Sequence, residues 1–445
     1  MKGPILSFAE QYAEKNGIRM HMPGHKGLAF TGAEPLDITE ITGADSLYEA
    51  SGIIAESEAR TAEIFGTKKT LYSTEGSSQC IRAMLSLLRF YADKTQRKPY
   101  ILATRNAHKT FISAIGLLDF DVRFLSPCEG ATLMHAPIDL SLLERELEKE
   151  RPLALYITSP DYLGSIAPIE EIAALCHRYG TLLLVDNAHG AYLRFLAPSR
   201  HPISLGADLC CDSAHKTLPA LTGASYLHLA DGLDSCFYEQ AKDAMALFGS
   251  TSPSYLILES LDLMTELLSK DFPKRLAAFL PLAEAFKARL LSRGFSLMGD
   301  EPMKVTILPK DFGYTGNGLA EVLREAKIEC EFSDADSLVL MLSPYMTEEM
   351  LDKTAEVLCS LPRLSPIEEK PPTPHIPERA CSVREAMLSA SELLPLAEAK
   401  GKTLVSLAIG CPPAILPVTA GEILDEKAIE ILQYYGITEC RAKIR

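Results

Sequence analysis

Short apolar runs alternate with helical patterns between about residues 66 and 230 of this 445-residue chain. The runs predict strands at YILATR (100–105), VRFL (122–125), LALYITSP (153–160), TLLLVDNA (181–188), ADLCCDS (207–213) and ASYLHLA (224–230). Between them, SSQCIRAMLSLLRFYADK (77–94) and IEEIAALCHRYG (169–180) carry apolar residues at helical spacing. Because strands and helices alternate, we expect an α/β fold with a mostly parallel sheet covered by helices on both faces.

The pattern changes after this region, which predicts further domains. Two long helical patterns follow Tyr255, and then MKVTILP (303–309), GLAEVLREAKI (318–328) and SLVLMLSP (337–344) suggest a smaller α+β unit. A proline-rich linker, SPIEEKPPTPHIPERA (365–380), precedes the last segment. We therefore expect a large domain over residues 1–268, a small α+β domain over 269–364, and a linker with a C-terminal α+β domain over 365–445.

Composition excludes several classes of protein. The formal net charge of −15 disfavours a nucleic-acid partner, which requires a basic surface. The eleven cysteines include no CxxC and no metal-ligand spacing, so we expect reduced thiols in a cytoplasmic protein and no metal. No stretch approaches the roughly 20 apolar residues of a membrane-spanning helix, so we expect no membrane contact.

Reactive side chains follow several of the predicted strands. In an open α/β sheet, ligands bind at the carboxyl ends of the strands. Asp186 ends one strand and His189 follows it. Ser213, His215 and Lys216 follow another strand. Asn106 and His108 follow YILATR, while residues 74–78 lead from a short apolar run into a helix.

Pyridoxal phosphate is the cofactor that needs this set of groups. It requires a lysine for a Schiff base, a carboxylate for the pyridine nitrogen, a flat group against its ring, and a helix N-terminus for its phosphate. Lys216, Asp186, His108 and the turn at 76–79 supply them in that order. Taken singly, each group has an ordinary structural explanation, such as a turn, a helix cap or a solvated charge. A dinucleotide site is disfavoured because no GxGxxG follows any strand.

A resemblance to a known family rests on longer blocks of sequence. These are HMPGHKG (21–27), DITEITGADSLYEASGIIAESE (37–58), TRNAHKTF (104–111), VDNAHGAY (185–192), SAHKTLPALTGASYLHL (213–229), STSPSYLILESLD (250–262) and CPPAILPVTAGE (411–422). In this order they resemble the Orn/Lys/Arg decarboxylase family, pyridoxal-phosphate enzymes of aspartate-aminotransferase fold (fold type I). The resemblance implies a large domain with a seven-stranded-type sheet. The length suits the shorter form of the family, without its N-terminal wing.

The resemblance implies a role for each matched residue. Lys216 would carry the cofactor, Asp186 would pair with the pyridine nitrogen, and His108 would stack on the ring. Other cofactor contacts would come from Gly76, Ser77, Ser78, Gln79, His189, Ser213 and His215, and from Thr251 and Ser252 of a neighbouring subunit in a homodimer or higher assembly. His215 or Lys216 would return a proton to the α-carbon. The implied reaction is decarboxylation of arginine, lysine or ornithine to a polyamine precursor.

The chain also departs from the family pattern. Glu75 stands in TEGSSQ where an asparagine is usual, so its carboxylate must point away from a phosphate. Asn187 stands where an acidic residue is common, and the tail reads CPPAILP rather than an aromatic residue followed by Pro-Pro-Gly. For the cationic end of the substrate, the acidic candidates in matching loops are Asp45, Glu329 and Glu331.

Two alternative functions remain open from the sequence. The first is another enzyme of the same fold, an aminotransferase or a C–S lyase. An aminotransferase would need an arginine for the substrate's α-carboxylate, and Arg105 and Arg194 are the candidates. The second is a non-catalytic paralogue, which would bind no cofactor. The presence of Lys216, Asp186 and His108 together disfavours it.

Overall fold

The computed structural model describes residues 3–408 and 413–444, which divide into two compact units. The first unit comprises Met1–Ile101, Glu146–Ile157 and Ile169–Lys274. The second comprises Leu102–Arg145, Thr158–Pro168 and Arg275–Arg445. The second unit's final segment begins near the predicted boundary at residue 268. The predicted boundary at 364 falls within the second unit, so the three-domain division stays a prediction.

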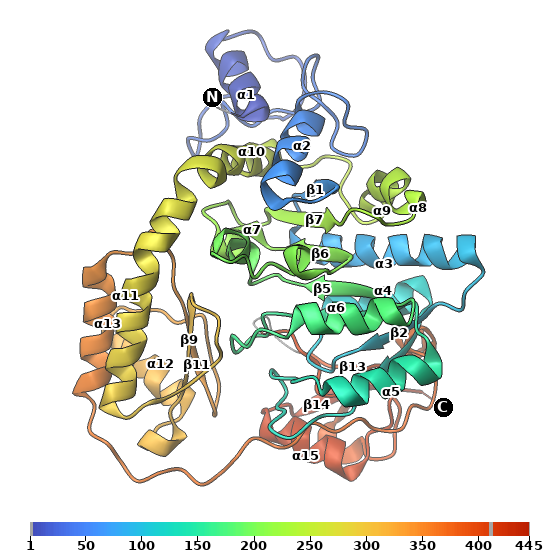
Figure 1. The fold of residues 1–445 in the computed structure, drawn as a ribbon, viewed down its shortest axis with the longest axis vertical. Coiled ribbons are helices and arrows are strands. Elements are labelled where there is room, and N and C mark those ends of the chain that lie inside the picture. The colour runs from blue at the N-terminus through green and yellow to red at the C-terminus, as the bar shows by residue number, and fades with distance from the viewer. Residues whose placement is uncertain (1–2, 409–412, 445) are drawn as a thin grey trace. The chain divides into compact units, whose positions relative to one another are not determined.

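A seven-stranded sheet confirms the predicted fold class. Its strand order is β1-β7-β6-β5-β4-β2-β3, and its strands are β1 (Lys69–Ser73), β2 (Tyr100–Ala103), β3 (Asp121–Phe124), β4 (Ala154–Thr158), β5 (Leu182–Asp186), β6 (Leu209–Asp212) and β7 (Ser225–Leu229). The neighbours β5 and β6 are parallel, whereas β7 is antiparallel to both β6 and β1. Figure 1 shows β5, β6 and β7 side by side in green.

Several helices of the first unit pack against this sheet, and others pack on those helices. They are α1 (Pro4–Glu14), α2 (Ile53–Phe65), α3 (Gly76–Thr95), α6 (Ile169–Arg178), α7 (Ala214–Thr217), α8 (Ser235–Glu239), α9 (Ala241–Ala246) and α10 (Tyr255–Lys270), with 3-10 turns η1 (Ala191–Phe195) and η2 (Pro202–Leu205). The long helix α3 packs against β1, β6 and β7, while α2 packs against β1 and α6 against β5. The helix α2 ends at Gly66, whose φ of 71° suits a glycine.

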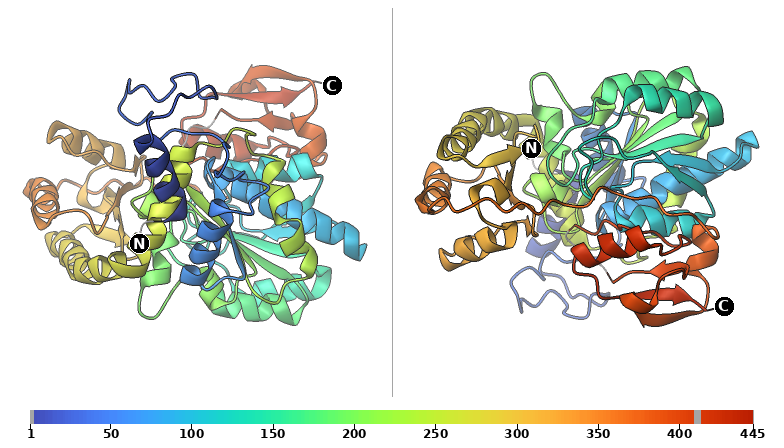
Figure 2. Two further views of the ribbon diagram at one scale, coloured as in Figure 1. Left: turned by 90° about the horizontal axis from the view of Figure 1, so that it is seen from above. Right: turned by 90° about the horizontal axis from the view of Figure 1, so that it is seen from below.

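The second unit contains two smaller antiparallel sheets. The first has the order β10-β11-β9-β8, from β8 (Ser296–Met298), β9 (Lys304–Leu308), β10 (Phe332–Ser333) and β11 (Leu338–Met341). The second has the order β12-β14-β13, from β12 (Ser391–Pro395), β13 (Leu404–Ser406) and β14 (Glu439–Lys443), drawn in red in Figure 2. Its helices are α4 (Lys109–Leu118), α12 (Gly316–Glu325), α13 (Glu348–Ser360), α14 (Val383–Met387) and α15 (Glu426–Tyr434), with η3 (Lys310–Phe312) and η4 (Leu396–Glu398). The helices α5 (Leu140–Glu150) and α11 (Phe272–Arg293) have residues in both units.

The central strands are buried along almost their whole length. Every residue of β6 and β7 is buried, and so are the last four residues of β5. Strands covered on both faces read as continuous apolar runs, which is why the sequence identified them. Polar side chains interrupt these apolar runs near the carboxyl ends of β5 and β6, namely Asp186, Asn187, Asp212 and Ser213, all at most 3% exposed. Buried polar groups at that edge mark the part of the sheet where function is expected.

None of the helices in the described ranges combines the length and the apolar character that a membrane crossing requires.

Candidate active site

Lys216 lies in the short helix α7, directly after β6. Its Nζ donates to Nε2 of His189, which follows β5, at 3.0 Å. The segment after the lysine returns to the start of α3, where the backbone N–H of Gly76 donates to the carbonyl of Gly223 at 2.8 Å. Gly223 has a φ of 98°, and a Cβ there would lie 2.9 Å from the carbonyl oxygen of Thr74. Glycine at this position therefore lets the loop that carries Lys216 approach the turn that opens α3.

Asp186 is the last residue of β5 and is 3% exposed. Its carboxylate accepts from Tyr156 Oη at 3.2 Å and from the backbone N–H of Ala188 at 3.2 Å. Burial raises the pKa of Asp186 above its ordinary value, and the nearby Lys216 ammonium opposes that shift. A buried carboxylate whose charge is penalised in this way is suited to pair with a protonated ring nitrogen, which would supply the missing positive charge.

The N-terminus of α3 already uses two backbone donors, because the N–H of Glu75 donates to Ser73 Oγ at 3.1 Å and that of Gly76 to the Gly223 carbonyl, so an anion would meet the helix at Ser77 and Ser78. The N-cap residue Glu75 makes no side-chain hydrogen bond to the helix, and its carboxylate accepts instead from the backbone N–H of Ser250. The Glu75 carboxylate is thus engaged by Ser250 and does not cap the helix. In the same unit, the Ser213 and Thr217 hydroxyls are buried without a hydrogen-bond partner. The unsatisfied hydroxyls and the uncapped helix fit the phosphate of pyridoxal phosphate.

The other predicted phosphate contacts have varied surroundings. Gln79 is 1% exposed, and its side-chain amide is already bonded to Tyr48 Oη, to the Met245 carbonyl and to Ser73 Oγ. Ser77 and Ser78 are half-buried in the first turn of α3. Thr251 and Ser252 are exposed, close in sequence to the Ser250 amide that Glu75 accepts. The Gln79 side chain therefore stabilises the fold, and its predicted phosphate contact stays a prediction.

His215 is half-buried, and its Nδ1 donates to the carbonyl oxygen of Ala224 at 2.9 Å. Burial lowers the pKa of His215 below its ordinary value. The imidazole is therefore neutral at pH 7, with Nε2 as an acceptor. Between the two predicted proton donors, these surroundings favour Lys216.

His108 lies in the second unit, at the N-cap of α4. Its Nδ1 accepts from the backbone N–H of Thr110 at 3.1 Å, so Nε2 carries the ring proton. The backbone at His108 also forms an antiparallel bridge with Ile415, and the Lys109 N–H donates to the Ala414 carbonyl at 2.8 Å. The tail segment from Pro413 onwards thus helps to fix this histidine, while residues 411 and 412 of CPPAILP lie outside the described residues.

The two arginines that an aminotransferase would need are both engaged. Arg105 donates to both oxygens of Glu422 at 2.9 and 2.7 Å, and the two side chains are 5% and 0% exposed. Arg194 donates through Nε to the Ile64 carbonyl at 2.9 Å. The Arg105 guanidinium is thus held by Glu422, and that of Arg194 is bonded to the Ile64 carbonyl and, at 3.4 Å, to Ser204 Oγ.

The acidic candidates for the substrate differ in their availability. The Asp45 carboxylate accepts from the backbone N–H groups of Ser46, Ser51, Gly52, Ile54 and Ala55 at 2.8–3.4 Å. Burial opposes ionisation, but these bonds prevail and lower the pKa of Asp45, which makes it a structural cap for α2. Glu331 accepts from Tyr162 Oη at 3.0 Å and is half-buried. Glu329 is exposed and lies 3.8 Å from Arg324. Glu331 therefore remains the better candidate.

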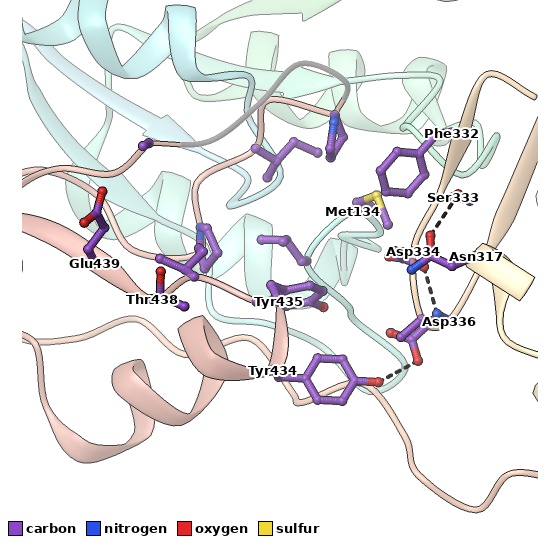
Figure 3. Close-up of a pocket in the computed structure, with 18 residues that line it drawn as sticks. Met134, Asn317, Phe332, Ser333, Asp334, Asp336, Tyr434, Tyr435, Thr438 and Glu439 are labelled. Atoms are coloured by element: carbon purple, nitrogen blue, oxygen red, sulfur yellow. Dashed lines mark hydrogen bonds between the residues drawn. The ribbon is translucent and has the colours of Figure 1, made fainter. Parts of the chain in front are cut away.

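A cavity of about 600 Å³ lies within the second unit (Figure 3). Phe332, Tyr434 and Tyr435 line it together with Asp334 and Asp336. Tyr434 Oη donates to Asp336 at 2.7 Å, and Lys310 lies 2.7 Å from the same carboxylate. Asp334 accepts from the backbone N–H groups of residues 336 and 337. Both aspartates are therefore already paired with the protein.

The sequence did not indicate a group of buried polar residues behind the site. Asp212 contacts Asn187, His201 and His228, and all four residues are completely buried. Position 187 carries an amide in this chain, and the carboxylate next to it is that of Asp212, at the end of β6. Strand alternation could have indicated that Cys211 and Asp212 lie on different faces of β6, but His201 comes from a turn with no such pattern.

The family model described as "Orn/Lys/Arg decarboxylase, major domain" matches residues 3–298. Among curated proteins, the arginine decarboxylase of Bacillus subtilis (strain 168) is 29% identical over 96% of this chain and 92% of its own length. The arginine decarboxylase of Bacillus anthracis is also 29% identical, over 97% of this chain and 92% of its own length.

Solved structures show the same fold. The lysine decarboxylase LdcF of Francisella novicida superposes with a TM-score of 0.82 at 19% identity and covers 100% of this chain and 81% of its own. Lysine decarboxylase A of Pseudomonas aeruginosa gives a TM-score of 0.81 at 20% identity, covering 97% of this chain and 75% of its own. At these identities the likeness concerns the fold alone.

Proposed function

The chain belongs to the Orn/Lys/Arg decarboxylase family and is a decarboxylase of basic amino acids, and we propose that arginine is its substrate and pyridoxal phosphate its cofactor. Arginine is favoured because three relatives that are 29% identical over nearly the whole chain carry the name arginine decarboxylase. The lysine decarboxylases share the fold at lower identity and do not bear on the choice of substrate.

The observation that carries the cofactor proposal is the pairing of Lys216 with His189 beside the buried carboxylate of Asp186. When bound, pyridoxal phosphate supplies a conjugated ring that accepts the electron pair released as carbon dioxide leaves. Asp186 holds a proton on the ring nitrogen through its carboxylate. The Ser213 hydroxyl and the first turn of α3, at Ser77 and Ser78, would bind the phosphate, whereas the Gly76 N–H is already bonded to the Gly223 carbonyl.

Lys216 has two tasks in this proposal. Its amine would hold the cofactor, and the same Nζ would supply the proton that the α-carbon receives. His189 holds Nζ at 3.0 Å through a hydrogen bond and so orients the amine between these steps. His215, whose imidazole is neutral, offers Nε2 as a hydrogen-bond acceptor and does not donate the proton that the α-carbon receives.

The remaining proposed contacts come from other segments of the chain and from a neighbouring subunit. His108 provides the flat group against the ring, with its Nε2–H directed by the Nδ1 bond to Thr110. Glu331, bonded to Tyr162, binds the substrate's guanidinium group. Thr251 and Ser252 complete the phosphate site of a neighbouring subunit in a homodimer. The enzyme acts in the cytoplasm, in polyamine biosynthesis.

Absorbance of the purified protein tests this proposal. We expect a visible band from pyridoxal phosphate that sodium borohydride fixes to the protein, and we expect Lys216→Ala to abolish both the band and the fixation. Lys94→Ala, which removes an exposed lysine paired with Asp234 at 2.6 Å, is the matched control and should keep them. A wild-type protein that remains colourless after reconstitution with pyridoxal phosphate would refute the proposal.

A further inference from the structure

Asp212 is a completely buried carboxylate at the end of the strand that delivers Lys216. Its Oδ1 accepts from Asn187 Nδ2 at 2.7 Å. Its Oδ2 lies 3.0 Å from Nε2 of His201 and 3.2 Å from Nε2 of His228. All four side chains belong to the first unit and are 0% exposed.

This group lies on the face of β6 opposite Asp186. Successive side chains of a strand point to opposite faces. The Cys211 thiol lies 3.6 Å from Asp186 on one face, whereas Asp212 lies with Cys210 and His228 on the other. Phe65 of α2 covers His228 there, with 4.5 Å between the ring centroids. Asp212 therefore acts from behind the sheet and does not contact the proposed cofactor site.

The Asn187–Asp212 hydrogen bond joins the two chain segments that carry the proposed catalytic groups. Asn187 directly follows Asp186, and Asp212 directly precedes the Ser213–Lys216 segment. The paired register of β5 and β6 ends at Asp186 and Cys211, and the Asn187 N–H to Cys211 carbonyl bond of 2.9 Å extends it by one residue. The side-chain bond then holds the two strand ends together just beyond the last backbone bond.

A buried charge at this position requires a reason. Burying a carboxylate is costly unless its charge is paired and its oxygens accept hydrogen bonds. Burial opposes ionisation of Asp212, but His201 and His228 prevail and hold the pKa of its carboxyl far below the ordinary value, so it is ionised. Apolar side chains could fill the same space at lower cost. The charged group is explained if its hydrogen bonds fix a geometry that apolar packing would leave loose.

We propose that Asn187 and Asp212 are positioning residues that set the spacing between Asp186 and Lys216, an inference that rests on the proposed function of those two residues. The amide donates and the carboxylate accepts across a bond of 2.7 Å between adjacent strand ends. Loss of the bond lets the two strand ends separate, and a displacement of Lys216 relative to Asp186 slows the reaction although neither residue has changed.

Moving the carboxylate across the hydrogen bond tests this directly. Asn187→Asp places two carboxylates in contact. Asp212→Asn leaves one amide oxygen, which can accept from Asn187 or from the two histidines while the NH₂ group faces the other donors, so each single variant disrupts the group as built. The double variant Asn187→Asp/Asp212→Asn restores one carboxylate and one amide with the roles exchanged. Coupled neighbours give non-additive effects in such a cycle, so each single change should lower kcat by about tenfold or more while the double variant recovers to within about threefold.

The readouts are kcat, the visible band of bound pyridoxal phosphate with its pH dependence, and the melting temperature. Asp208→Asn is the control, since Asp208 lies at the other end of β6 and accepts from Leu183 N–H at 2.7 Å and from His177 at 2.9 Å. It should lower the melting temperature and leave kcat and the band unchanged. The single variants should instead shift the band and its pH midpoint.

Three results would overturn the inference. The first is that the Asn187 and Asp212 variants change only the melting temperature, with kcat and the visible band as in the wild type. The second is a double variant no better than the product of the single effects. The third is a stoichiometric metal ion in the purified holoenzyme that is lost in Cys210→Ser, because donor atoms of His201, Cys210 and Asp212 lie within 4.8 Å of one another. Failure of the proposed function is distinguishable, since wild-type enzyme would then release no carbon dioxide.

Discussion

The Nζ of Lys216 donates to Nε2 of His189 at 3.0 Å, across the ends of β6 and β5. Nε2 must carry a lone pair to accept this bond, so the His189 proton resides on Nδ1. The imidazole thus holds the Lys216 amine in one orientation. Because His189 is only 6% exposed, its own position is fixed by the residues packed around it.

We expect His189→Gln to keep the cofactor but to lower kcat by roughly 10–100-fold, because misplaced catalytic groups lose this much rate without losing binding. Steady-state release of carbon dioxide and the intensity of the visible band measure the two effects separately. His177→Gln changes an exposed histidine on α6 and should leave both unchanged. A His189→Gln enzyme with wild-type kcat would show that the contact has no role in turnover.

Asp186→Asn should separate cofactor binding from folding. Burial raises the pKa of Asp186, so its ionised form is disfavoured in the folded apoprotein at pH values where the unfolded chain has already lost the proton. Removing the charge should make the apoprotein at least as stable at pH 7. The cofactor affinity should fall, because the ring nitrogen loses its anionic partner. Thermal melts of apoprotein and a titration with pyridoxal phosphate check this; a less stable variant with unchanged affinity would contradict it.

Glu259 makes the stability depend on pH away from the candidate site. Burial, reinforced by the carboxyls of Asp37, Asp262 and Glu10, raises the pKa of Glu259 from 4.5 to about 8. Between these two pH values the folded state keeps a proton that the unfolded state has lost. The free energy of unfolding therefore falls as the pH rises from about 4.5 to 8, by about 1.4 kcal/mol per pH unit.

Glu259→Gln should remove this dependence and raise the melting temperature at pH 8 more than at pH 5. Melts of the apoprotein at both pH values measure it. Glu266→Gln, on the same helix but paired with Lys270 at 3.2 Å, is the control. An equal change at both pH values would mean that Glu259 is ionised throughout.

The Arg105–Glu422 pair holds the tail segment against the loop that leads to His108. Both side chains are almost completely buried, so Glu422→Ala leaves an uncompensated guanidinium and should cost about 3–5 kcal/mol of unfolding free energy. Glu385→Ala breaks a more exposed pair with Lys443 in the same unit and should cost at most about 1 kcal/mol. Denaturant titrations compare the two variants, and similar losses would contradict the account.

The sequence predicted the central sheet and three of its polar edge residues for a physical reason. Strands that are covered on both faces appear as continuous apolar runs, and Asp186, His189 and Lys216 follow two such runs directly. The strands β12 and β14 were not predicted. SELLP of β12 shows no alternation of buried residues, whereas ECRAK of β14 does alternate and could have indicated a strand.

Long-range polar pairs could not be predicted from local pattern. Arg105 and Glu422 are 317 residues apart, and no spacing in the sequence relates them. The role of Asp45 depends on how the backbone of residues 46–55 folds around its carboxylate. Asp212 lies between two histidines, and one of them, His201, stands just before the turn η2, where the sequence has no periodic pattern.

Product analysis with three substrates tests the central claim most directly. The purified enzyme, reconstituted with pyridoxal phosphate, is incubated separately with arginine, lysine and ornithine, and carbon dioxide, amine and keto acid are measured. We expect carbon dioxide and agmatine in equal amounts from arginine, a smaller or no yield from the other two, and none with Lys216→Ala. Formation of keto acid without carbon dioxide would contradict the account.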